Sequence, residues 1–305
     1  MQLRVLGSSA GGGFPQWNCN CPQCDGVRQG RVRATPRTQS SVAVSADGRD
    51  WLLINASPDI LTQIRATAQL QPARALRDSG IAAVLLMDAQ IDHTAGLLML
   101  RERRSPLPLL ATREVLAELE DSLPLTRVLS HYCGVAPHVL PLDGSRFSVP
   151  GLPGVVVQAL ALSSSPPPYS PHRSAPRPGD NIGVLLHNPV TGARIFYAPG
   201  LGALTPELLE LLASCSAVLV DGTFWSADEM QRLGLGTRSA ADMGHLPQSG
   251  PGGMLEHLAR LPASVRKVLI HINNTNPILI EDGAERAALA ACGVEVAHDG
   301  MTIEF

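Results

Sequence analysis

Short hydrophobic runs rich in β-branched residues alternate with longer stretches of helical periodicity along most of the chain. The short runs predict strands, at Met1–Gly7, Ser41–Val44, Trp51–Ile54, Ala82–Met87, Val155–Leu162, Ile182–Leu186, Ile195–Tyr197, Ala217–Val220 and Val268–Ile272. The periodic stretches predict helices, at Ile60–Leu70, Ala95–Arg104, Arg113–Leu123, Glu207–Ala213, Met254–Leu261 and Glu281–Cys292. The early strands follow one another as hairpins, whereas the later strands alternate with helices. This order predicts an α/β fold in which two mixed β-sheets are sandwiched between helices.

One segment interrupts the pattern. Residues 163–179 contain six prolines, and strand-like sequence resumes directly after them at Asn181. A loop of this length inside a compact domain is typical of a functional lid or of a disordered segment. We expect a Pro-rich lid at about 163–179 within a single domain that spans residues 1–305.

Composition and charge exclude several classes of protein. Of the 305 residues, 45% are hydrophobic and 17% are charged, which is enough apolar material for a sizeable core. The net charge of −3 provides no basic surface for nucleic acid or for an anionic membrane. No apolar run approaches the roughly 18 residues of a membrane span, and the first strand is too short for a signal peptide. We therefore expect a soluble, cytoplasmic protein that binds neither nucleic acid nor membrane.

Three of the six cysteines crowd into one short stretch, at Cys19, Cys21 and Cys24. Thiolates at this spacing on a Gly/Pro-rich loop can converge on one soft-accepting cation, and zinc is the usual occupant. The alternative is a reactive or redox cluster without metal. A fourth ligand must come from far along the chain, and the local sequence does not identify it. The other three cysteines stand alone and are typical of small buried hydrophobic residues.

A second group of polar residues follows a strongly hydrophobic strand. Asp88, Gln90, Asp92 and His93 stand between this strand and a helix expected to open at Thr94. Side chains at the carboxyl end of a strand point into a crevice rather than into the core, so these four would gather around one point. The alternative is that Asp92 only caps the following helix.

Other strands end in the same way. Asp221 ends one hydrophobic run, His271 ends another, and His245 lies in a Gly/Pro turn. One such ending is often a cap or a hydrogen-bonded core histidine. Three of them beside Asp92 and His93 favour a shared site.

These passages resemble known families. The stretch from Asp88 to Gly96 resembles the H-x-H-x-D-H motif of the metallo-β-lactamase superfamily, with both leading histidines replaced, and His271 resembles its final metal histidine. The glycine- and cysteine-rich start, the passages around Asp221 and His245, and His271–Pro277 resemble the coenzyme PQQ synthesis protein B family from end to end. The resemblance implies an αββα sandwich and a role in making pyrroloquinoline quinone (PQQ).

The departures from the superfamily change the expected chemistry. By resemblance, hydrolytic members carry histidines at the positions of Asp88 and Gln90, another near the serines 163–165, and a bridging aspartate where Pro199 and Gly200 stand. Asp92, His93 and His271 survive. Two imidazoles and one carboxylate with open positions suit non-haem Fe²⁺ and oxygen chemistry, although zinc at isolation is also expected. They do not supply the usual dinuclear activation of water.

The resemblance also implies roles for the remaining residues. Asn274 is implied as the fourth ligand of the structural Zn²⁺, because related phosphodiesterase-like proteins carry a histidine there. His245 is implied as a proton-transfer or substrate-orienting group, and Asp221 as an orienting residue or alternative ligand. Asp88 and Gln90 would hydrogen-bond the site from their own turn. Arg173 and Arg177 on the lid are candidate partners of an acidic substrate.

The resulting hypothesis is a mononuclear iron hydroxylase. Its substrate would derive from cross-linked glutamate and tyrosine, as a small molecule or a short peptide, and the phenol ring would gain oxygen. One alternative is a non-enzymatic carrier of PQQ or its precursor, with PQQ as a bound product. Another is a degraded zinc hydrolase. A homodimer is left open.

Overall fold

Two seven-stranded sheets form the centre of the molecule in a computed structural model that describes residues 1–305. The first sheet has the order β14-β1-β2-β3-β4-β5-β6, with β1 Gln2–Gly7, β2 Ser41–Ser45, β3 Trp51–Ile54, β4 Ile81–Leu85, β5 Leu107–Ala111, β6 Val135–Val139 and β14 Thr302–Glu304. The second has the order β13-β12-β11-β10-β9-β8-β7, with β7 Phe147–Ser148, β8 Val156–Ala161, β9 Ile182–His187, β10 Arg194–Ala198, β11 Ala217–Asp221, β12 Arg266–Ile270 and β13 Val294–Val296.

Both sheets are mixed in the same way. Neighbours from β3 to β6 pair in parallel, as do those from β10 to β13, and the other pairs are antiparallel. Because parallel strands end at one edge of a sheet, the residues that follow β11 and β12 are brought together in the second sheet. The residues that follow β4 lie at the matching edge of the first sheet, where Asp92 comes within 3.5 Å of His271.

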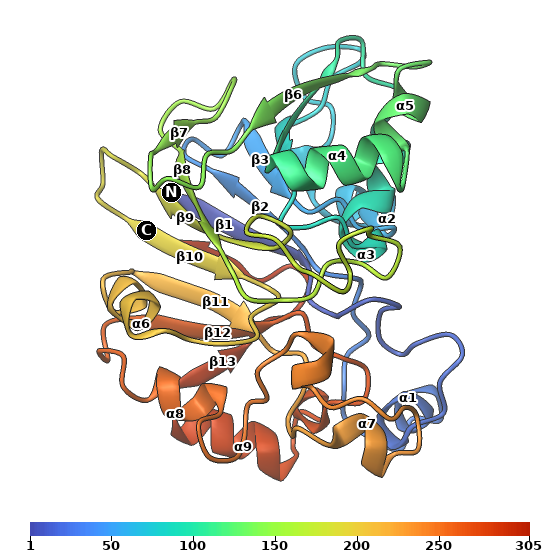
Figure 1. The fold of residues 1–305 in the computed structure, drawn as a ribbon, viewed down its shortest axis with the longest axis vertical. Coiled ribbons are helices and arrows are strands. Elements are labelled where there is room, and N and C mark those ends of the chain that lie inside the picture. The colour runs from blue at the N-terminus through green and yellow to red at the C-terminus, as the bar shows by residue number, and fades with distance from the viewer.

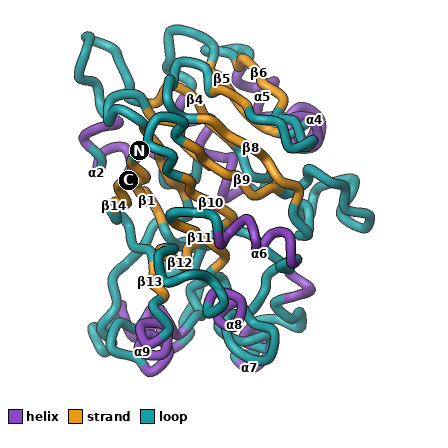
Figure 2. The backbone as a smooth tube through the Cα atoms, turned by 90° about the vertical axis from the view of Figure 1, so that its left-hand side faces the viewer, coloured by secondary structure: helices purple, strands orange, loops and turns teal.

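Helices cover the outer face of each sheet (Figures 1 and 2). The helical segments are α1 Pro22–Arg28, α2 Ile60–Ala66, α3 Ile91–Thr94, α4 Arg113–Asp121, α5 Leu125–Leu129, α6 Pro206–Ala213, α7 Glu229–Arg232, α8 Met254–Leu258 and α9 Ala284–Ala291, with 3₁₀ turns η1 Ala68–Leu70, η2 Ala95–Leu100, η3 Ala241–Met243 and η4 Pro277–Leu279. Helices α2, α4 and α5 pack on the first sheet, and α6, α8 and α9 pack on the second. The predicted αββα sandwich is confirmed.

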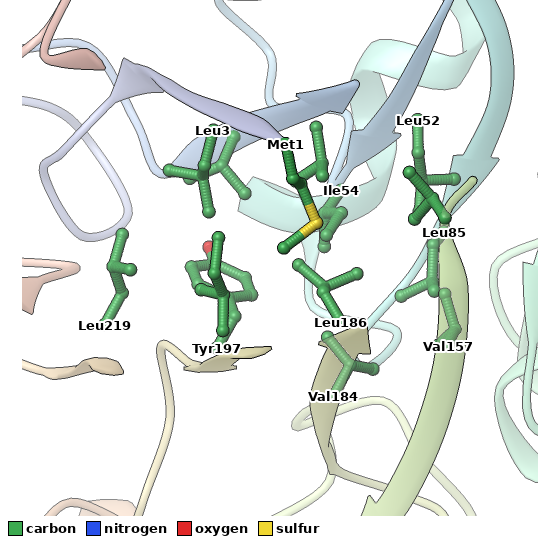
Figure 3. Close-up of a cluster of buried hydrophobic side chains, with 14 of the residues drawn as sticks. Met1, Leu3, Leu52, Ile54, Leu85, Val157, Val184, Leu186, Tyr197 and Leu219 are labelled. Atoms are coloured by element: carbon green, nitrogen blue, oxygen red, sulfur yellow. The ribbon is translucent and has the colours of Figure 1, made fainter. Parts of the chain in front are cut away.

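The largest core cluster lies between the two sheets. Leu52, Ile54 and Leu85 of the first sheet face Leu186 and Tyr197 of the second, and all are shielded from water (Figure 3). Truncating one of these leucines to alanine would destabilise the fold by about 2–5 kcal/mol. This packing of one sheet on the other fixes the strand ends of the first sheet relative to those of the second.

Several predicted boundaries were wrong. The helix expected over Ile60–Leu70 is α2 followed by the separate turn η1, and the helix expected from Thr94 begins at Ile91. Strands β5, β6, β7, β13 and β14 were not predicted. β5 and β6 contain prolines, and β6 lies at a sheet edge, where a missing N–H is tolerated.

The Pro-rich segment 163–179 runs over the site edge of the sandwich. The hydroxyl of Tyr169 donates to the carbonyl of Ala89, and the hydroxyl of Thr112 donates to the carbonyl of Gly179 (2.7 Å). These contacts fasten the segment to loops of the first sheet. Its movement as a lid, and the single domain over 1–305, stay predictions.

Candidate functional site

His93 is oriented by a carboxylate of its own turn. Its Nδ1–H donates to Asp88, 2.8 and 2.9 Å from the two carboxylate oxygens, and both side chains are buried. The other ring nitrogen, Nε2, is buried and has no hydrogen-bond partner. Burial alone would lower the pKa of His93, but the charges of Asp88 and Asp92 outweigh it and raise the pKa to about 9. An unpaired buried nitrogen of this kind is a ready metal ligand.

His271 is oriented by a hydroxyl group. Its Nδ1 lies 3.0 Å from Oγ1 of Thr223, and that hydroxyl is also 3.0 Å from the carbonyl oxygen of His271. Because the hydroxyl has one proton and gives it to the carbonyl, the ring must donate through Nδ1–H. The lone pair of Nε2 is then free to bind a metal. His271 itself has a φ of 60°, in the left-handed region, directly after β12.

Asp92 completes the first ligand set. Its Oδ2 lies 3.8 Å from Nε2 of His93 and 3.5 Å from Nε2 of His271. Ligands bound at about 2.1 Å to one cation are separated by roughly 3.0–3.5 Å. Burial would raise the pKa of Asp92, but the neighbouring imidazoles lower it well below its usual range. The distance to His271 falls in the range for ligands of one cation and the distance to His93 is slightly longer, so one carboxylate and two imidazole nitrogens need only a small adjustment to share a single metal ion.

His245 stands beside this set as a third imidazole. Its ring stacks on that of His271 with centroids 5.8 Å apart. Its Nδ1 bonds to Oδ2 of Asp221 at 2.6 Å, which leaves Nε2 for the pocket. Burial would lower the pKa of His245, but the charge of Asp221 raises it.

Asp221 is an orienting residue in this arrangement. Besides His245, its carboxylate accepts from the backbone N–H groups of Leu201 and Thr223, both at 2.9 Å. It also belongs to a second group of potential ligands with His245 and His271, so a direct role in metal binding stays open as predicted. Its three hydrogen bonds favour the role of a residue that orients His245 over that of a metal ligand.

A pocket of about 240 Å³ opens beside the ligand atoms. Ser164, Ser165 and Gly200 line it, so the segments predicted to lack the superfamily's further ligands do lie at the site. Gln90 also lines it, and its amide donates to the carbonyl of Ser165 at 3.4 Å. On the lid, Arg173 lines the pocket and Arg177 does not.

The sequence did not point to Thr223 or Arg238. Both line the pocket. Thr223 lies in the passage around Asp221 that carries the family resemblance, but no role was predicted for it, and Arg238 belongs to no motif that we could interpret. Thr223 lies two residues after Asp221, and its partner His271 is 48 residues further on. Only the parallel pairing of β11 with β12 brings the two together.

The three clustered cysteines form a separate centre. Cys19, Cys21 and Cys24 are buried, and their sulfur atoms lie within 4.8 Å of one another. Backbone N–H groups point at all three sulfurs, from Cys21 to Cys19 (3.4 Å), from Cys24 to Cys21 (3.5 Å) and from Gln16 to Cys24 (3.3 Å). Burial and the neighbouring Cys24 raise the pKa of Cys21 to about 12, so a bound cation is needed to hold Cys21 as a thiolate.

Asn274 lies against this centre, as expected. Its amide nitrogen is 3.1 Å from the sulfur of Cys19 and 3.4 Å from that of Cys24. The amide therefore presents N–H groups to the sulfurs, and its oxygen would face a metal only after a 180° rotation. The liganding role of Asn274 stays a prediction.

No helix of the structure is both long and apolar enough to cross a bilayer.

Comparison with known proteins finds close relatives along the whole chain. Residues 50–272 match the family described as Beta-lactamase superfamily domain. The chain is 64% identical to Coenzyme PQQ synthesis protein B of Cupriavidus necator, over 99% of this chain and 98% of that protein. It is 61% identical to the protein of the same name from Azoarcus sp., over the full length of both.

Solved structures agree. The crystal structure of Zn²⁺-bound PqqB from Methylobacterium extorquens has a TM-score of 0.91 at 40% identity and covers 100% of both chains. A diphosphatase from the PhnP family has a TM-score of 0.70 at 18% identity, with 100% of this chain and 97% of that chain covered, which shows the shared fold alone.

Proposed function

The chain belongs to the coenzyme PQQ synthesis protein B family within the β-lactamase superfamily, and from this premise we propose that it acts in PQQ biosynthesis as an iron-dependent, oxygen-using hydroxylase. The substrate is the cross-linked glutamate–tyrosine precursor, and the reaction adds oxygen to its tyrosine ring.

One observation carries the proposal. Nε2 of His93 is buried without a partner, while its Nδ1 is committed to Asp88. With Asp92 and the free Nε2 of His271, it makes a set of one carboxylate and two imidazoles that leaves room for further ligands. This is the donor set of mononuclear Fe²⁺ oxygenases. A bound Fe²⁺ would supply the one-electron and oxygen chemistry that no side chain offers.

The surrounding residues have separate tasks. Asp88 and Thr223 bond to Nδ1 of His93 and His271, so that Nε2 of each would be the nitrogen presented to a metal. His245 exchanges a proton with the substrate at its own Nε2, because Asp221 occupies its Nδ1 and stabilises the protonated ring. Ser164, Ser165 and Gln90 orient the substrate along the pocket wall.

We further propose a structural Zn²⁺ at Cys19, Cys21 and Cys24. Thiolates with N–H donors are soft ligands that favour zinc over Fe²⁺ at a closed site. The Zn²⁺ in the Methylobacterium extorquens relative supports zinc in this family without identifying the metal of the reactive site.

Metal analysis and product mass test the function together. The protein is purified without oxygen, loaded with Fe²⁺, and mixed with the precursor, a two-electron reductant such as ascorbate, and ¹⁸O₂. Insertion of one oxygen atom into a ring C–H bond consumes O₂, two electrons and two protons, and releases one water. We expect product that carries ¹⁸O, and none from zinc-loaded protein.

The rival functions give different results. A carrier would bind the precursor or PQQ tightly and return it unchanged with either metal. A zinc hydrolase would be active with zinc alone and would take its new oxygen from water. Either result would replace the hydroxylase.

A further inference from the structure

The pocket beside the reactive centre carries two permanent positive charges. Among its charged lining residues, Asp88 and Asp92 are already committed to the histidines, whereas Arg173 and Arg238 belong to no ion pair. Most of the remaining wall is polar. A pocket of about 240 Å³ with this lining suits a small, acidic molecule rather than an apolar one.

Arg238 precedes a turn that is held by hydrogen bonds between Ser239 and Asp242. The carboxylate of Asp242 accepts from the backbone N–H and the hydroxyl of Ser239, both at 2.8 Å, which holds the segment between α7 and η3. That carboxylate forms no salt bridge with Arg238, although its pKa is lowered first by the bonds with Ser239 and then by the positive charge of Arg238. By contrast, Arg232 at the end of α7 is paired with Asp228 at 3.4 Å.

Arg173 lies on the Pro-rich segment, which is hydrogen-bonded within itself and to helix α4. Its Nη1 donates to the carbonyl of Pro166. The hydroxyl of Ser170 accepts from the N–H of His172 (3.0 Å) and donates to the buried carboxylate of Glu118 on α4. The turn is thereby anchored, and the remaining guanidinium nitrogens of Arg173 are free for a ligand.

We propose that Arg173 and Arg238 bind carboxylates of one substrate molecule and so place the atoms between them at the reactive centre. A guanidinium forms paired hydrogen bonds with a carboxylate, which fixes direction as well as charge. The inference rests on the proposed function for the identity of the acidic substrate. It adds a residue, Arg238, that determines specificity from the rim of the pocket.

Binding to the zinc-loaded protein tests the pair without turnover. Calorimetry measures the affinity of the cross-linked glutamate–tyrosine compound and of an analogue whose carboxylates are amides. We expect Arg173→Gln and Arg238→Gln each to weaken binding of the acid about tenfold, and the double variant about a hundredfold. Arg238→Lys should fall in between, since it keeps the charge and loses the paired geometry.

Two other arginines serve as matched controls. Arg177→Gln removes a lid arginine outside the pocket, and Arg232→Gln removes a paired surface arginine near Arg238; both should bind the acid like the wild type. The proposal is overturned if Arg238→Gln binds within twofold of wild type, if the amide binds as tightly as the acid, or if the wild type binds neither. Arginine-dependent binding without ¹⁸O product from the iron-loaded protein would instead remove the hydroxylase function and leave the arginine pair in place.

Discussion

The cysteine centre and the reactive centre both include a residue of the loop that follows β12, but they differ in their access to solvent. His271 and Asn274 are three residues apart, yet one faces the pocket and the other faces three buried sulfurs. The cysteine centre is enclosed by backbone N–H donors and joins the hydrophobic cluster under the second sheet. A closed metal site stabilises a fold, and an open one leaves a position for a substrate. The difference in access supports the proposed division between a structural role and a reactive one.

The loop between the two centres is held by side-chain hydrogen bonds of Thr275 and Asn276. Asn276 donates to the carbonyl of Gly222 (2.9 Å) and to the side chain of Gln248 (2.8 Å), and all three residues lie in the second half of the chain. The hydroxyl of Thr275 donates to buried Glu229 (2.5 Å). Because these contacts do not involve either ligand set, each centre should survive the loss of the other.

Removing a histidine from the reactive centre should have the largest effect. His93→Ala and His271→Ala each delete one of the two imidazole nitrogens of the ligand set, and Nδ1 of the neighbouring His245 is already bonded to Asp221. We expect loss of iron from this centre and loss of product, with the cysteine-bound zinc retained. Metal content and ¹⁸O product are measured for both variants. Full iron content together with full activity in both would show that the ligand set is wrong.

His245→Ala should separate metal binding from turnover. The ring is held by Asp221 and contacts the pocket, but Asp92, His93 and His271 remain as ligands. We expect the variant to keep its iron and to turn over about 10²-fold more slowly, if proton transfer limits the rate. Loss of iron would instead identify His245 as a ligand, and an unchanged rate would remove it from the chemistry.

Cys21→Ser should act on the other centre. A serine hydroxyl is a poor zinc ligand, so we expect the zinc content to fall and the melting temperature to drop by about 5–10 °C. The reactive centre should still take up iron. Cys292→Ser, which changes an exposed cysteine outside the cluster, is the control and should alter neither quantity. Unchanged zinc in Cys21→Ser would refute the structural zinc site.

The outline of both centres could be predicted from the sequence because their ligands are local or end a strand. Cys19, Cys21 and Cys24 lie within one short stretch, and Asp92 with His93 follows the hydrophobic run of β4. His271 follows β12 in the same manner. Hydrophobic periodicity identified these strands. The rule that residues at the carboxyl ends of strands point into a crevice then predicted that Asp92, His93 and His271 share one site.

The partners of these ligands could not be predicted with equal certainty. Thr223 matters only because β11 and β12 are neighbours, and strand order is not a local property of the sequence. Arg238 stands in a segment with no strand or helix pattern, and only the folded chain brings it to the pocket. For Asp221, the sequence left two roles open, and its hydrogen bonds with Leu201 and Thr223 favour the orienting one.

Asp88→Asn should have the smallest effect of these substitutions, and it should act on metal binding through His93, chiefly by changing the pKa of that ring. In the metal-free protein the charges of Asp88 and Asp92 raise the pKa of His93 from 6.5 to about 9. A metal must displace that proton, so the affinity of the wild-type reactive centre should rise with pH and level off near pH 9.

Without the charge of Asp88, only the charge of Asp92 opposes the effect of burial, so the pKa of His93 should be lower than in the wild type and the metal affinity should level off at a lower pH. Above pH 9 the variant should bind metal about tenfold more weakly, because the amide orients and polarises the ring less well. Metal titrations from pH 6 to 9.5 measure both quantities, and Asp228→Asn, at an exposed carboxylate, is the control.

The pH dependence of the stability of the metal-free protein is an independent test of the raised pKa of His93. A folded-state pKa above the unfolded value of 6.5 stabilises the fold below that pH, and the stabilisation is lost as the pH rises through about 9. The melting temperature of the metal-free wild type should therefore fall between pH 6.5 and 9, and that of Asp88→Asn should fall less. If both proteins show the same pH dependence, then Asp88 does not hold the proton of His93, and the orientation of that ring must come from packing alone.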